Sequence, residues 1–456
     1  MKLFMIILAA GNSSRFGYNK LFFRIGQKAM YERTIERMRA ISLSGCETKI
    51  YMVSQYKELL EGIKSDAEGI YNPYPQYGIS YSIKLAIDKI KEKMKEEDVV
   101  MFSVCDQPYM RTDSLFGLIE GFIASHRGIG CPGTGQMLGN PVLFRKKYLE
   151  ELYALEGDCG GKRVVRKHLE DVWMCEVSEK ELEDLDMAPL VIVRGGGDLA
   201  SGTIYHLKKE GYRVLVLETE APACIRRQVA FCECIYEGKT IVEGMEAVRI
   251  QSEEEMKEAW KTEKIPVCVD AQGKWIETLL PQIVVDGILA KKNLGTTLDM
   301  APLTIGLGPG FEAGVDVTAV IETMRGDSLG KIYYEGRALP NTGVPGVICG
   351  YSKERVIHAP ADGVICYEKV VGEPVRKEEI IAYIDEVPVR ATMDGFLRGA
   401  IRPGYVVNKG LKIIDTDPRR EEVKYCWQIS DKAHCIAESV MKVIKEWEER
   451  ICTSGM

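Results

Sequence analysis

The stretch from Leu3 to Lys20 reads LFMIILAAGNSSRFGYNK and determines the fold of the first part of the chain. It opens with an apolar run that is too short to cross a membrane, and it continues into a loop rich in Gly, Asn and Ser. An unbroken apolar run of this kind is typical of a strand buried inside a parallel sheet. A glycine-rich loop directly after such a strand exposes backbone N–H groups that can bind phosphate oxygens. The opening therefore predicts a buried strand followed by a phosphate-binding loop.

Further apolar runs alternate with amphipathic stretches along the first part of the chain. We expect strands at residues 49–53 and 99–104, and helices around residues 30–40 and 80–95. Strands that alternate with helices predict an α/β domain with a mostly parallel, doubly wound sheet. The pattern continues to about residue 186, where the acidic stretch at 181–186 indicates a linker. We therefore assign residues 1–186 to the first domain.

Composition excludes several classes of protein. A chain of 456 residues is too long for a single hydrophobic core. The net charge of −7 provides no basic surface for nucleic acid or an anionic membrane. The 14 Cys residues are scattered, which favours reduced thiols and a soluble, cytoplasmic protein over a disulfide scaffold. Cys232 and Cys234 form a Cys-x-Cys pair, which is only half of a typical zinc site.

A second α/β unit follows the acidic stretch. A strand at 190–193 leads into the turn Gly195-Gly196-Gly197-Asp198-Leu199-Ala200-Ser201-Gly202, and the next strand ends at Glu218. This order predicts a Rossmann-like α/β domain over residues 187–350. The turn either binds a nucleotide or another phosphate ligand, or serves packing alone. The candidate ligand residues are Gly195, Gly196, Gly197, Asp198, Ser201, Gly202 and Glu218.

Residues 351–420 contain an internal repeat. The pentapeptide at 359–363 (APADG) recurs at 391–395 (ATMDG), an offset of 32 residues. Two related β units predict a two-fold sandwich similar to the barrel-sandwich hybrid of biotinyl and lipoyl carriers. Such carriers present a Lys between the two halves, whereas this chain has EVPVR at 386–390, so a swinging-arm carrier is not expected. We expect a terminal helix over residues 421–456.

The strongest chemical signal is the loop after the first strand. Arg15 and Lys20 place two cations at this loop, which lacks the Gly-Lys-Ser/Thr ending of an ATPase P-loop. Asp106 follows the strand at 99–104, at the edge where open α/β sheets bind ligands. A carboxylate facing phosphates suits Mg²⁺, and Asp158, within a glycine-rich stretch, is the second candidate metal ligand.

These motifs resemble the molybdenum cofactor cytidylyltransferases, within the molybdopterin nucleotidyltransferases. The resemblance rests on LAAG at 8–11 with SR at 14–15, NP at 72–73, GIS at 78–80, DQP at 106–108 and GDCGGKR at 157–163. Ala10 and the DQP sequence resemble the corresponding residues of the family members that use CTP. The chain departs from the family at GNP (139–141) and GGKR (160–163), which bears on the pterin form that it accepts.

The resemblance implies Mg²⁺-dependent transfer of CMP from CTP to molybdopterin, with release of pyrophosphate. Arg15, Lys20 and Asp106 would be catalytic, and Asp106 and Asp158 would hold the metal. A sugar or polyol phosphate is the alternative acceptor. The residues expected to bind the nucleotide are Leu8, Ala9, Ala10, Gly11, Asn12, Ser13, Ser14, Arg15, Lys20, Asn72, Gly78, Ser80 and Ser82.

Residues 190–417 are similar to the YqeB-type accessory proteins of selenium-dependent molybdenum hydroxylases. This resemblance rests on the glycine turn at 195–202, Glu218, Arg226 and Arg227. It implies a place in the same cofactor pathway and a molybdenum hydroxylase apoenzyme as partner. Two non-catalytic alternatives remain open for this part: a module that handles the cofactor or selenium, and a docking or dimerisation surface.

Overall fold

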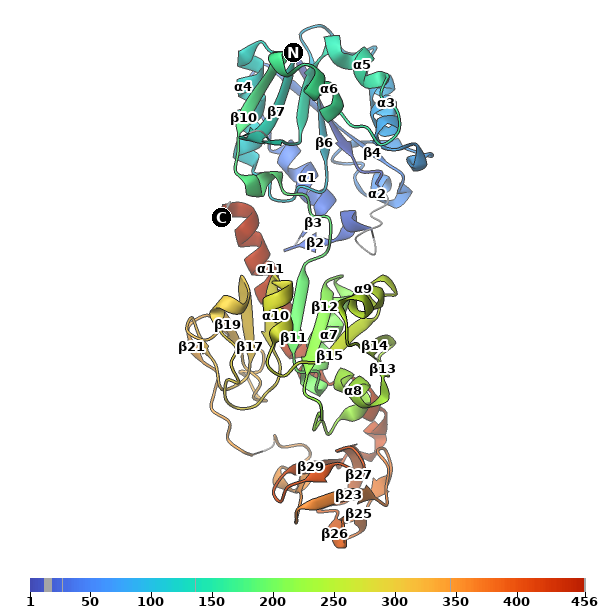
Figure 1. The fold of residues 1–456 in the computed structure, drawn as a ribbon, viewed down its shortest axis with the longest axis vertical. Helices are drawn as coiled ribbons and strands as arrows, with labels where there is room; N and C mark the ends of the chain where they lie inside the picture. Colours follow the sequence, from blue (N-terminus) through green and yellow to red (C-terminus); the bar gives the residue numbers. More distant parts are fainter. Residues whose placement is uncertain (12–18, 27, 136, 345, 455–456) are drawn as a thin grey trace. The chain divides into compact units, whose positions relative to one another are not determined.

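The chain divides into two compact units in the computed structural model, which describes residues 1–11, 19–26, 28–135, 137–344 and 346–454 (Figure 1). Unit 1 comprises residues 1–188 and 445–456, and unit 2 comprises residues 189–444. Within the described residues, no helix is long and apolar enough to cross a membrane. The finer division into four domains at residues 186, 350 and 420 stays a prediction.

Unit 1 is built on a mixed sheet with the strand order β10-β7-β9-β6-β1-β4-β5, in which β8 pairs with β7. Strands β6, β1, β4 and β5 are parallel, whereas β9 runs antiparallel to both β6 and β7. The α/β class is therefore confirmed, with a more mixed sheet than expected. The strands are β1 (Lys2–Leu8), β4 (Glu47–Ser54), β5 (Glu68–Tyr71), β6 (Val99–Val104), β7 (Ile129–Thr134), β8 (Met137–Leu138), β9 (Val142–Arg145) and β10 (Val172–Glu176).

Helices cover both faces of this sheet, which explains why β1 is apolar throughout. Phe4 and Ile6 belong to the core formed with α3, α5 and α6, and Leu3, Met5 and Ile7 belong to the core formed with α1, α2 and α4. Side chains alternate between the two faces of a strand, so a strand covered on both faces must be apolar at every position. The helices are α1 (Met30–Arg39), α2 (Lys57–Gly62), α3 (Ile79–Ile90), α4 (Thr112–Ser125), α5 (Leu149–Tyr153) and α6 (Lys162–Lys167).

Unit 2 contains a nine-stranded mixed sheet with the order β13-β14-β15-β12-β11-β16-β17-β19-β20. From β15 to β19 all neighbours are parallel, and β13 and β20 add antiparallel edges. The strands are β11 (Leu190–Arg194), β12 (Arg213–Glu218), β13 (Lys239–Val242), β14 (Met245–Arg249), β15 (Ile265–Val269), β16 (Ile283–Asp286), β17 (Leu303–Leu307), β19 (Ala319–Ile321) and β20 (Ile332–Tyr333).

The chain order of the parallel strands determines where this sheet can bind a ligand. The parallel strands lie in the order β14-β15-β12-β11-β16-β17-β19; those from β11 to β15 in the chain lie on one side and those from β16 on the other, so the strand order reverses between β11 and β16. Open α/β sheets bind ligands at the carboxyl ends of the strands on either side of such a reversal. The main helices of this part are α7 (Asp198–Lys209), α8 (Cys234–Glu237), α9 (Glu253–Lys261) and α10 (Lys274–Leu279).

The internal repeat forms two four-stranded antiparallel sheets in unit 2, β22-β29-β27-β24 and β26-β25-β23-β28. The first half of the repeat contains β22 to β25, and the second half contains β26 to β29. Each strand of the first half corresponds to the strand numbered four higher, and exchanging corresponding strands converts one sheet into the other. Equivalent hydrogen bonds occur in both halves: the N–H of Lys377 donates to Asp394 (2.7 Å), and the N–H of Lys409 donates to Asp362 (2.6 Å). The strands are β22 (Val356–His358), β23 (Gly363–Tyr367), β24 (Pro374–Val375), β25 (Ile380–Ile384), β26 (Val387–Arg390), β27 (Gly395–Ala400), β28 (Val406–Val407) and β29 (Lys412–Asp417).

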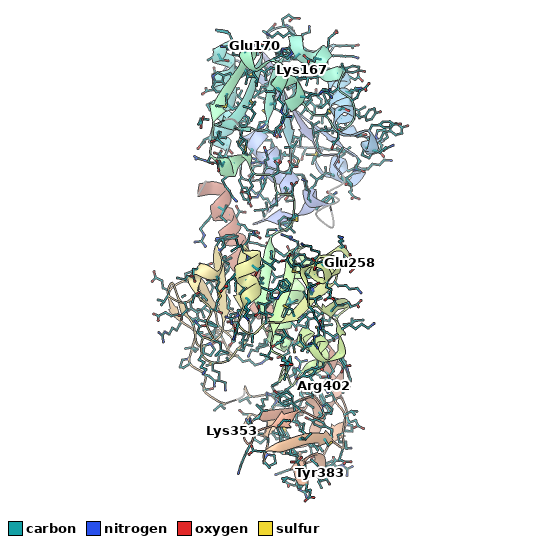
Figure 2. The ribbon with its side chains drawn as sticks, viewed as in Figure 1. Lys167, Glu170, Glu258, Lys353, Tyr383 and Arg402 are labelled. Carbon is teal, nitrogen blue, oxygen red and sulfur yellow. The ribbon has the colours of Figure 1, made fainter. Side chains whose placement is uncertain are left out.

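Arg402 connects these antiparallel sheets to the larger sheet of unit 2 (Figure 2). Its guanidinium group lies 4.5 Å from the ring centroid of Tyr236 and forms ion pairs with Glu233 (3.2 Å) and Glu237 (2.5 Å). Arg402 therefore links the two parts of unit 2 through two ion pairs and a cation–π contact.

The terminal helix α11 (Asp431–Ser454) begins later than residue 421, because residues 420–427 form a 3-10 segment. The hydroxyl of Ser430 accepts from the N–H of Ala433 (3.2 Å), which caps the first turn of α11. Gly202 in α7 lies so close to α11 that a Cβ atom there would be 2.8 Å from that of Ala433. Gly202 therefore allows the two helices to pack closely.

A pair of histidines links α7 to α11 and makes the stability of unit 2 sensitive to pH. Nε2 of His206 lies 3.0 Å from Nδ1 of His434, and burial, reinforced by His434, lowers the pKa of His206 below its ordinary value of 6.5. Below that value the unfolded chain binds a proton that the folded chain resists, so stability should fall as the pH drops below 6.5. We expect protection factors of α7 amides in hydrogen exchange to fall from pH 7.5 to pH 5.5 in the wild type, and to fall less in His206→Gln. Equal losses in both proteins would contradict this.

Candidate functional site

Lys20 and Asp106 meet at the carboxyl ends of β1 and β6 in unit 1. Nζ of Lys20 lies 2.8 Å from Oδ2 of Asp106, and both side chains are mostly buried. These strands are parallel neighbours, and the strand order reverses between them, which is where open α/β sheets bind ligands. The structure therefore brings together two of the three residues predicted to be catalytic. Arg15, with Asn12, Ser13 and Ser14, lies outside the described residues.

Side chains from the end of β4 hold the backbone that follows β1. The hydroxyl of Ser54 donates to the carbonyl of Ala9 (2.9 Å), the amide of Gln55 donates to the carbonyl of Ala10 (2.9 Å), and the hydroxyl of Tyr56 donates to the carbonyl of Gly11 (3.2 Å). Three successive carbonyl groups thus have donors, which fixes the start of the predicted phosphate-binding loop. Leu8 is the last residue of β1.

The turn that carries Asp106 is held from two sides. Nη1 of Arg37, in α1, donates to the carbonyls of Gln107 (3.1 Å) and Met110 (2.7 Å). The side-chain amide of Gln107 donates to Oδ1 of Asp184 (2.9 Å). Burial, and next to it the charge of Asp106, raise the pKa of the Asp184 carboxyl. Asp184 is therefore a second carboxylate beside Asp106 that the sequence analysis missed.

The acidic stretch at 181–186 packs beside this site, and the boundary between the two units follows it at residues 188–189. Glu181 is 3% exposed, and its carboxylate accepts from the N–H of Arg111 (3.1 Å) and the hydroxyl of Ser178 (3.1 Å). The N–H of Leu185 donates to the carbonyl of Asp106 (2.8 Å). The buried carboxylate of Glu181 is satisfied by a backbone N–H and a hydroxyl, a tertiary effect that an acidic sequence does not reveal.

The segment predicted to contact the base and ribose is tightly organised. Asn72 and Ser82 are both buried and share a hydrogen bond of 3.0 Å, so their side chains support the segment from within. Gly78 has a φ of +81°, and a Cβ atom there would lie 2.4 Å from the carbonyl oxygen of Gly157. The N–H of Ser80 donates to the same carbonyl (3.3 Å). Gly78 thus lets this segment approach the backbone beside Asp158.

The residues around Asp106 fit a hard cation such as Mg²⁺. Oδ1 of Asp106 is buried and has no hydrogen-bond donor in the described part of the chain, while Oδ2 contacts Lys20. Mg²⁺ typically takes one or two carboxylates and completes its shell with water and substrate phosphates. No group of three or more His, Cys, Asp or Glu side chains within the described residues could hold a metal alone. The pairing of Asp158 with Asp106 at one ion stays a prediction.

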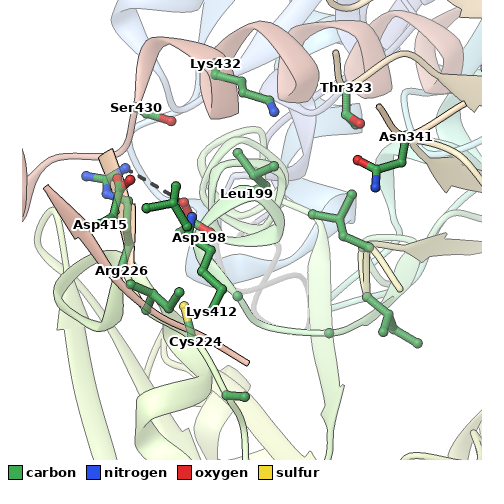
Figure 3. A pocket seen from close by; sticks show the side chains of 18 of the residues that line it. Asp198, Leu199, Cys224, Arg226, Thr323, Asn341, Lys412, Asp415, Ser430 and Lys432 are labelled. Carbon is green, nitrogen blue, oxygen red and sulfur yellow. Dashed lines mark ion pairs between the residues drawn. The ribbon is translucent and has the colours of Figure 1, made fainter. Parts of the chain in front are cut away.

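The glycine turn of unit 2 lines a separate cavity. Gly195, Gly197, Asp198 and Glu218 border this cavity (Figure 3). Their role in binding a ligand stays a prediction. The hydroxyl of Ser201 instead donates to the carbonyl of Gly196 (3.2 Å) and accepts from the N–H of Phe231 (2.9 Å). Its role, like that of Gly202, is in packing.

The two cysteines of the Cys-x-Cys motif are not the two cysteines that interact in the structure. Cys232 and Cys234 are both fully buried. A hydrogen bond with Cys224 is the largest cause that raises the pKa of Cys232, and burial raises the pKa of Cys234 to about 12. Cys224 and Cys232 line the cavity of unit 2, whereas Cys234 does not.

Comparison with known families identifies unit 1. Residues 5–172 are a MobA-like NTP transferase domain. The MobA-like domain includes Lys20, Asp106 and the segment 72–82, and it ends before Asp184. This match supports a nucleotidyltransferase.

The chain is also similar to an uncharacterized protein, YqeB, of Escherichia coli (strain K12). The two are 44% identical over 255 residues, which is 56% of this chain and 47% of that protein. The chain thus spans about half the length of this curated relative. Unit 1 contains fewer residues than the 255 that are matched, so the similarity to YqeB extends into unit 2.

Solved structures also resemble part of the chain. Rv0371c from Mycobacterium tuberculosis H37Rv is 17% identical, with a TM-score of 0.35 over 41% of this chain and 92% of that one. Molybdopterin-guanine dinucleotide biosynthesis protein A from Archaeoglobus fulgidus is 16% identical, with a TM-score of 0.28 over 39% and 84%. Both scores are low, so the fold assignment rests on the strand order of the sheet.

Proposed function

We propose that the MobA-like domain transfers CMP from CTP to molybdopterin and releases pyrophosphate. The observation that supports this most strongly is the contact between Lys20 and Asp106 at the strand ends of a MobA-like domain. The preference for CTP rests on Ala10 and on the DQP sequence at 106–108. A second substrate class, a sugar or polyol phosphate, differs only in the acceptor.

In the proposed reaction, a terminal phosphate oxygen of the pterin attacks the α-phosphorus of CTP. The new P–O bond forms as the bond from the α-phosphorus to the bridging oxygen breaks, and pyrophosphate leaves. Such chemistry needs positioning and charge neutralisation, with no activated side-chain nucleophile. Lys20 neutralises the leaving phosphates, and the backbone from Ala9 to Gly11 orients them.

Asp106 is the residue that would hold Mg²⁺, through the buried Oδ1 atom that accepts no hydrogen bond from the described residues. Once bound, Mg²⁺ neutralises charge on the phosphate oxygens. Arg37 and Gln107 keep the Asp106 turn in place, and Asp184 orients Gln107. We further propose that the product serves a molybdenum hydroxylase apoenzyme, which rests on the sequence resemblance of residues 190–417 to accessory proteins of such enzymes.

A panel of substrates tests this function. The full chain is incubated with each of ATP, CTP, GTP and UTP, with Mg²⁺, and with molybdopterin or a polyol phosphate as acceptor. We expect pyrophosphate release with CTP and molybdopterin, and much less with each other pair. Release with the polyol phosphate alone would favour the second substrate class and contradict the proposal.

A further inference from the structure

A cavity of about 1150 Å³ lies within unit 2, at the carboxyl ends of its parallel strands (Figure 3). Gly195 and Gly197 follow β11, Glu218 ends β12, and residues 287–289 follow β16, and all of these line the cavity. The strand order reverses between β11 and β16, so the cavity occupies the position where open α/β sheets bind ligands. Its volume slightly exceeds the roughly 300–1,000 Å³ of ordinary small-molecule sites.

The loop after β11 has the spacing of a dinucleotide-binding turn, with Ala200 in the third position. Gly195 has a φ of +89°, which favours glycine. A Cβ atom at Gly287 would lie 2.8 Å from that of Ala200, so α7 packs closely against the end of β16. Gly197 differs from Gly195 and Gly287, because among the described residues, apart from its two chain neighbours, no heavy atom lies within 4 Å of the place of its Cβ.

The open space beside Gly197 adjoins the first turn of α7. Gly197 has a φ of −66° and a ψ of 176°, which any residue can adopt, so glycine is not required there by the backbone. A ligand that contacts the backbone closely would require it. The N-terminus of a helix of 12 residues favours a negative charge at this place.

The wall of the cavity carries more positive than negative charge. Two of its acidic side chains accept hydrogen bonds from the backbone: Glu218 accepts from the N–H of Gly196 (2.8 Å), and Glu322 accepts from the N–H of Met324 (2.7 Å). Arg226 pairs with Asp198 (3.9 Å). The basic residues of the wall are Arg226, Arg325, Arg355, Arg398, Lys412 and Lys432, and the acidic residues are Asp198, Glu218, Glu322 and Asp415.

Three of these arginines are buried and lack an acceptor for one donor. Arg226, Arg355 and Arg398 are at most 8% exposed, and the Nε–H of each makes no hydrogen bond in the part of the chain that the structure describes. Asp415 lies near both Arg355 (3.6 Å) and Arg398 (3.7 Å), and Asp417 lies 3.7 Å from Nε of Arg398, so three guanidinium groups face two carboxylates there. Buried donors are normally satisfied, so this wall is suited to an anionic ligand.

Lys432 brings a further charge from α11 into the cavity (Figure 3). Burial lowers its pKa, and the nearby charges of Arg325 and Lys412 add to this effect. A bound anion would stabilise the charged form of Lys432. The negative charges of Asp198 and Glu322 raise the pKa of Lys432 and so act against these effects. The wall as a whole keeps the excess of positive charge described above.

We propose that unit 2 binds a nucleotide with a diphosphate group, of dinucleotide size. The diphosphate lies against Gly197 and the first turn of α7, opposite Lys432, and the carboxylate of Glu218 accepts from ribose hydroxyls. The proposal does not depend on the activity of the MobA-like domain.

Calorimetry on the full chain tests this with NAD⁺, ADP, CDP and inorganic pyrophosphate as separate probes. We expect at least one nucleotide probe to bind, and Gly197→Val to weaken that binding at least about tenfold, because the side chain fills the space for the phosphates. Gly117→Val is the matched control, since Gly117 is exposed in α4 and also has open space around it. NAD⁺ binding more tightly than ADP would support a dinucleotide, and the reverse order would restrict the ligand to a mononucleotide and overturn the size inference.

Lys432→Met should weaken the same binding about tenfold, because it removes a charge-assisted contact. Lys261→Met, at an exposed position of α9, should leave it unchanged. Lys20→Ala removes binding to the MobA-like domain, so the two sites can be separated. If no probe binds at a site that responds to Gly197→Val and Lys432→Met, the proposal is wrong. Nucleotidyl transfer should persist in Gly197→Val, so this failure differs from that of the proposed function.

Discussion

Asp106→Asn should fold like the wild type and lose nucleotidyl transfer by about a thousandfold. The substitution keeps the shape of the side chain and an acceptor for Lys20, but it removes the negative charge that Mg²⁺ requires. The buried Oδ1 atom has no donor to lose, so folding should be unaffected. The measurement is the rate of pyrophosphate release with CTP, Mg²⁺ and molybdopterin, with circular dichroism to check the fold.

Asp184→Asn is the matched control for this experiment. Asp184 lies beside Asp106 and accepts from Gln107, and an asparagine oxygen can accept the same hydrogen bond. We expect a loss of less than about tenfold. If Asp106→Asn retains a near-normal rate, or if both variants lose activity equally, Asp106 is not the metal ligand.

Asp286→Ala should lower the free energy of unfolding of unit 2 by about 3–5 kcal/mol. Asp286 and Arg194 are the last residues of β16 and β11 and lie in register, 3.6 Å apart. Both are almost fully buried, and the hydroxyl of Thr296 donates to Asp286 (2.5 Å) and accepts from Arg194. Burial raises the pKa of Asp286, whereas the hydrogen bond from Thr296 and the positive charge of Arg194 act to lower it. Removing the carboxylate would leave a buried guanidinium group without its counter-ion.

Asp286→Asn provides the comparison, because it keeps the size of the side chain and one of the two acceptor oxygens that receive hydrogen bonds from Thr296 and from the N–H of Ile288. It should cost less, about 1–2 kcal/mol. Urea denaturation followed by hydrogen exchange at β11 and β16 amides reports on unit 2 alone. A loss below 1 kcal/mol in the alanine variant, or equal losses in both, would show that the ion pair does not stabilise the sheet.

Much of unit 1 could be predicted because its strands are buried on both faces. The runs at 3–8 and 99–104 are apolar at nearly every position, and the structure places them as the neighbours β1 and β6. The insertion of β9 between β6 and β7 could not be predicted, because chain order does not determine which strands pair. The repeat of residues 351–420 was visible because each strand of one half has a counterpart 32 residues later.

The candidate site was predicted where a residue follows directly on a strand. Asp106 has this position, and Lys20 follows the predicted phosphate-binding loop in the sequence. Asp184 could not be found, because charged stretches are more often solvated, and contacts with Gln107 and with the carbonyl of Asp106 bring its segment to the site. Arg194 and Asp286 are a partial exception: a charged residue at the end of a buried strand, directly before glycine, is a signal for a paired charge.

The proposed transfer of a cytidylyl group to a pterin phosphate can be observed in the product itself. The measurement is mass spectrometry of the pterin after incubation with the full chain, Mg²⁺ and an equal mixture of ATP, CTP, GTP and UTP. We expect a product heavier by one CMP unit, absent when Asp106→Asn replaces the wild type. An unmodified pterin, or a product that carries another nucleotide, would contradict it.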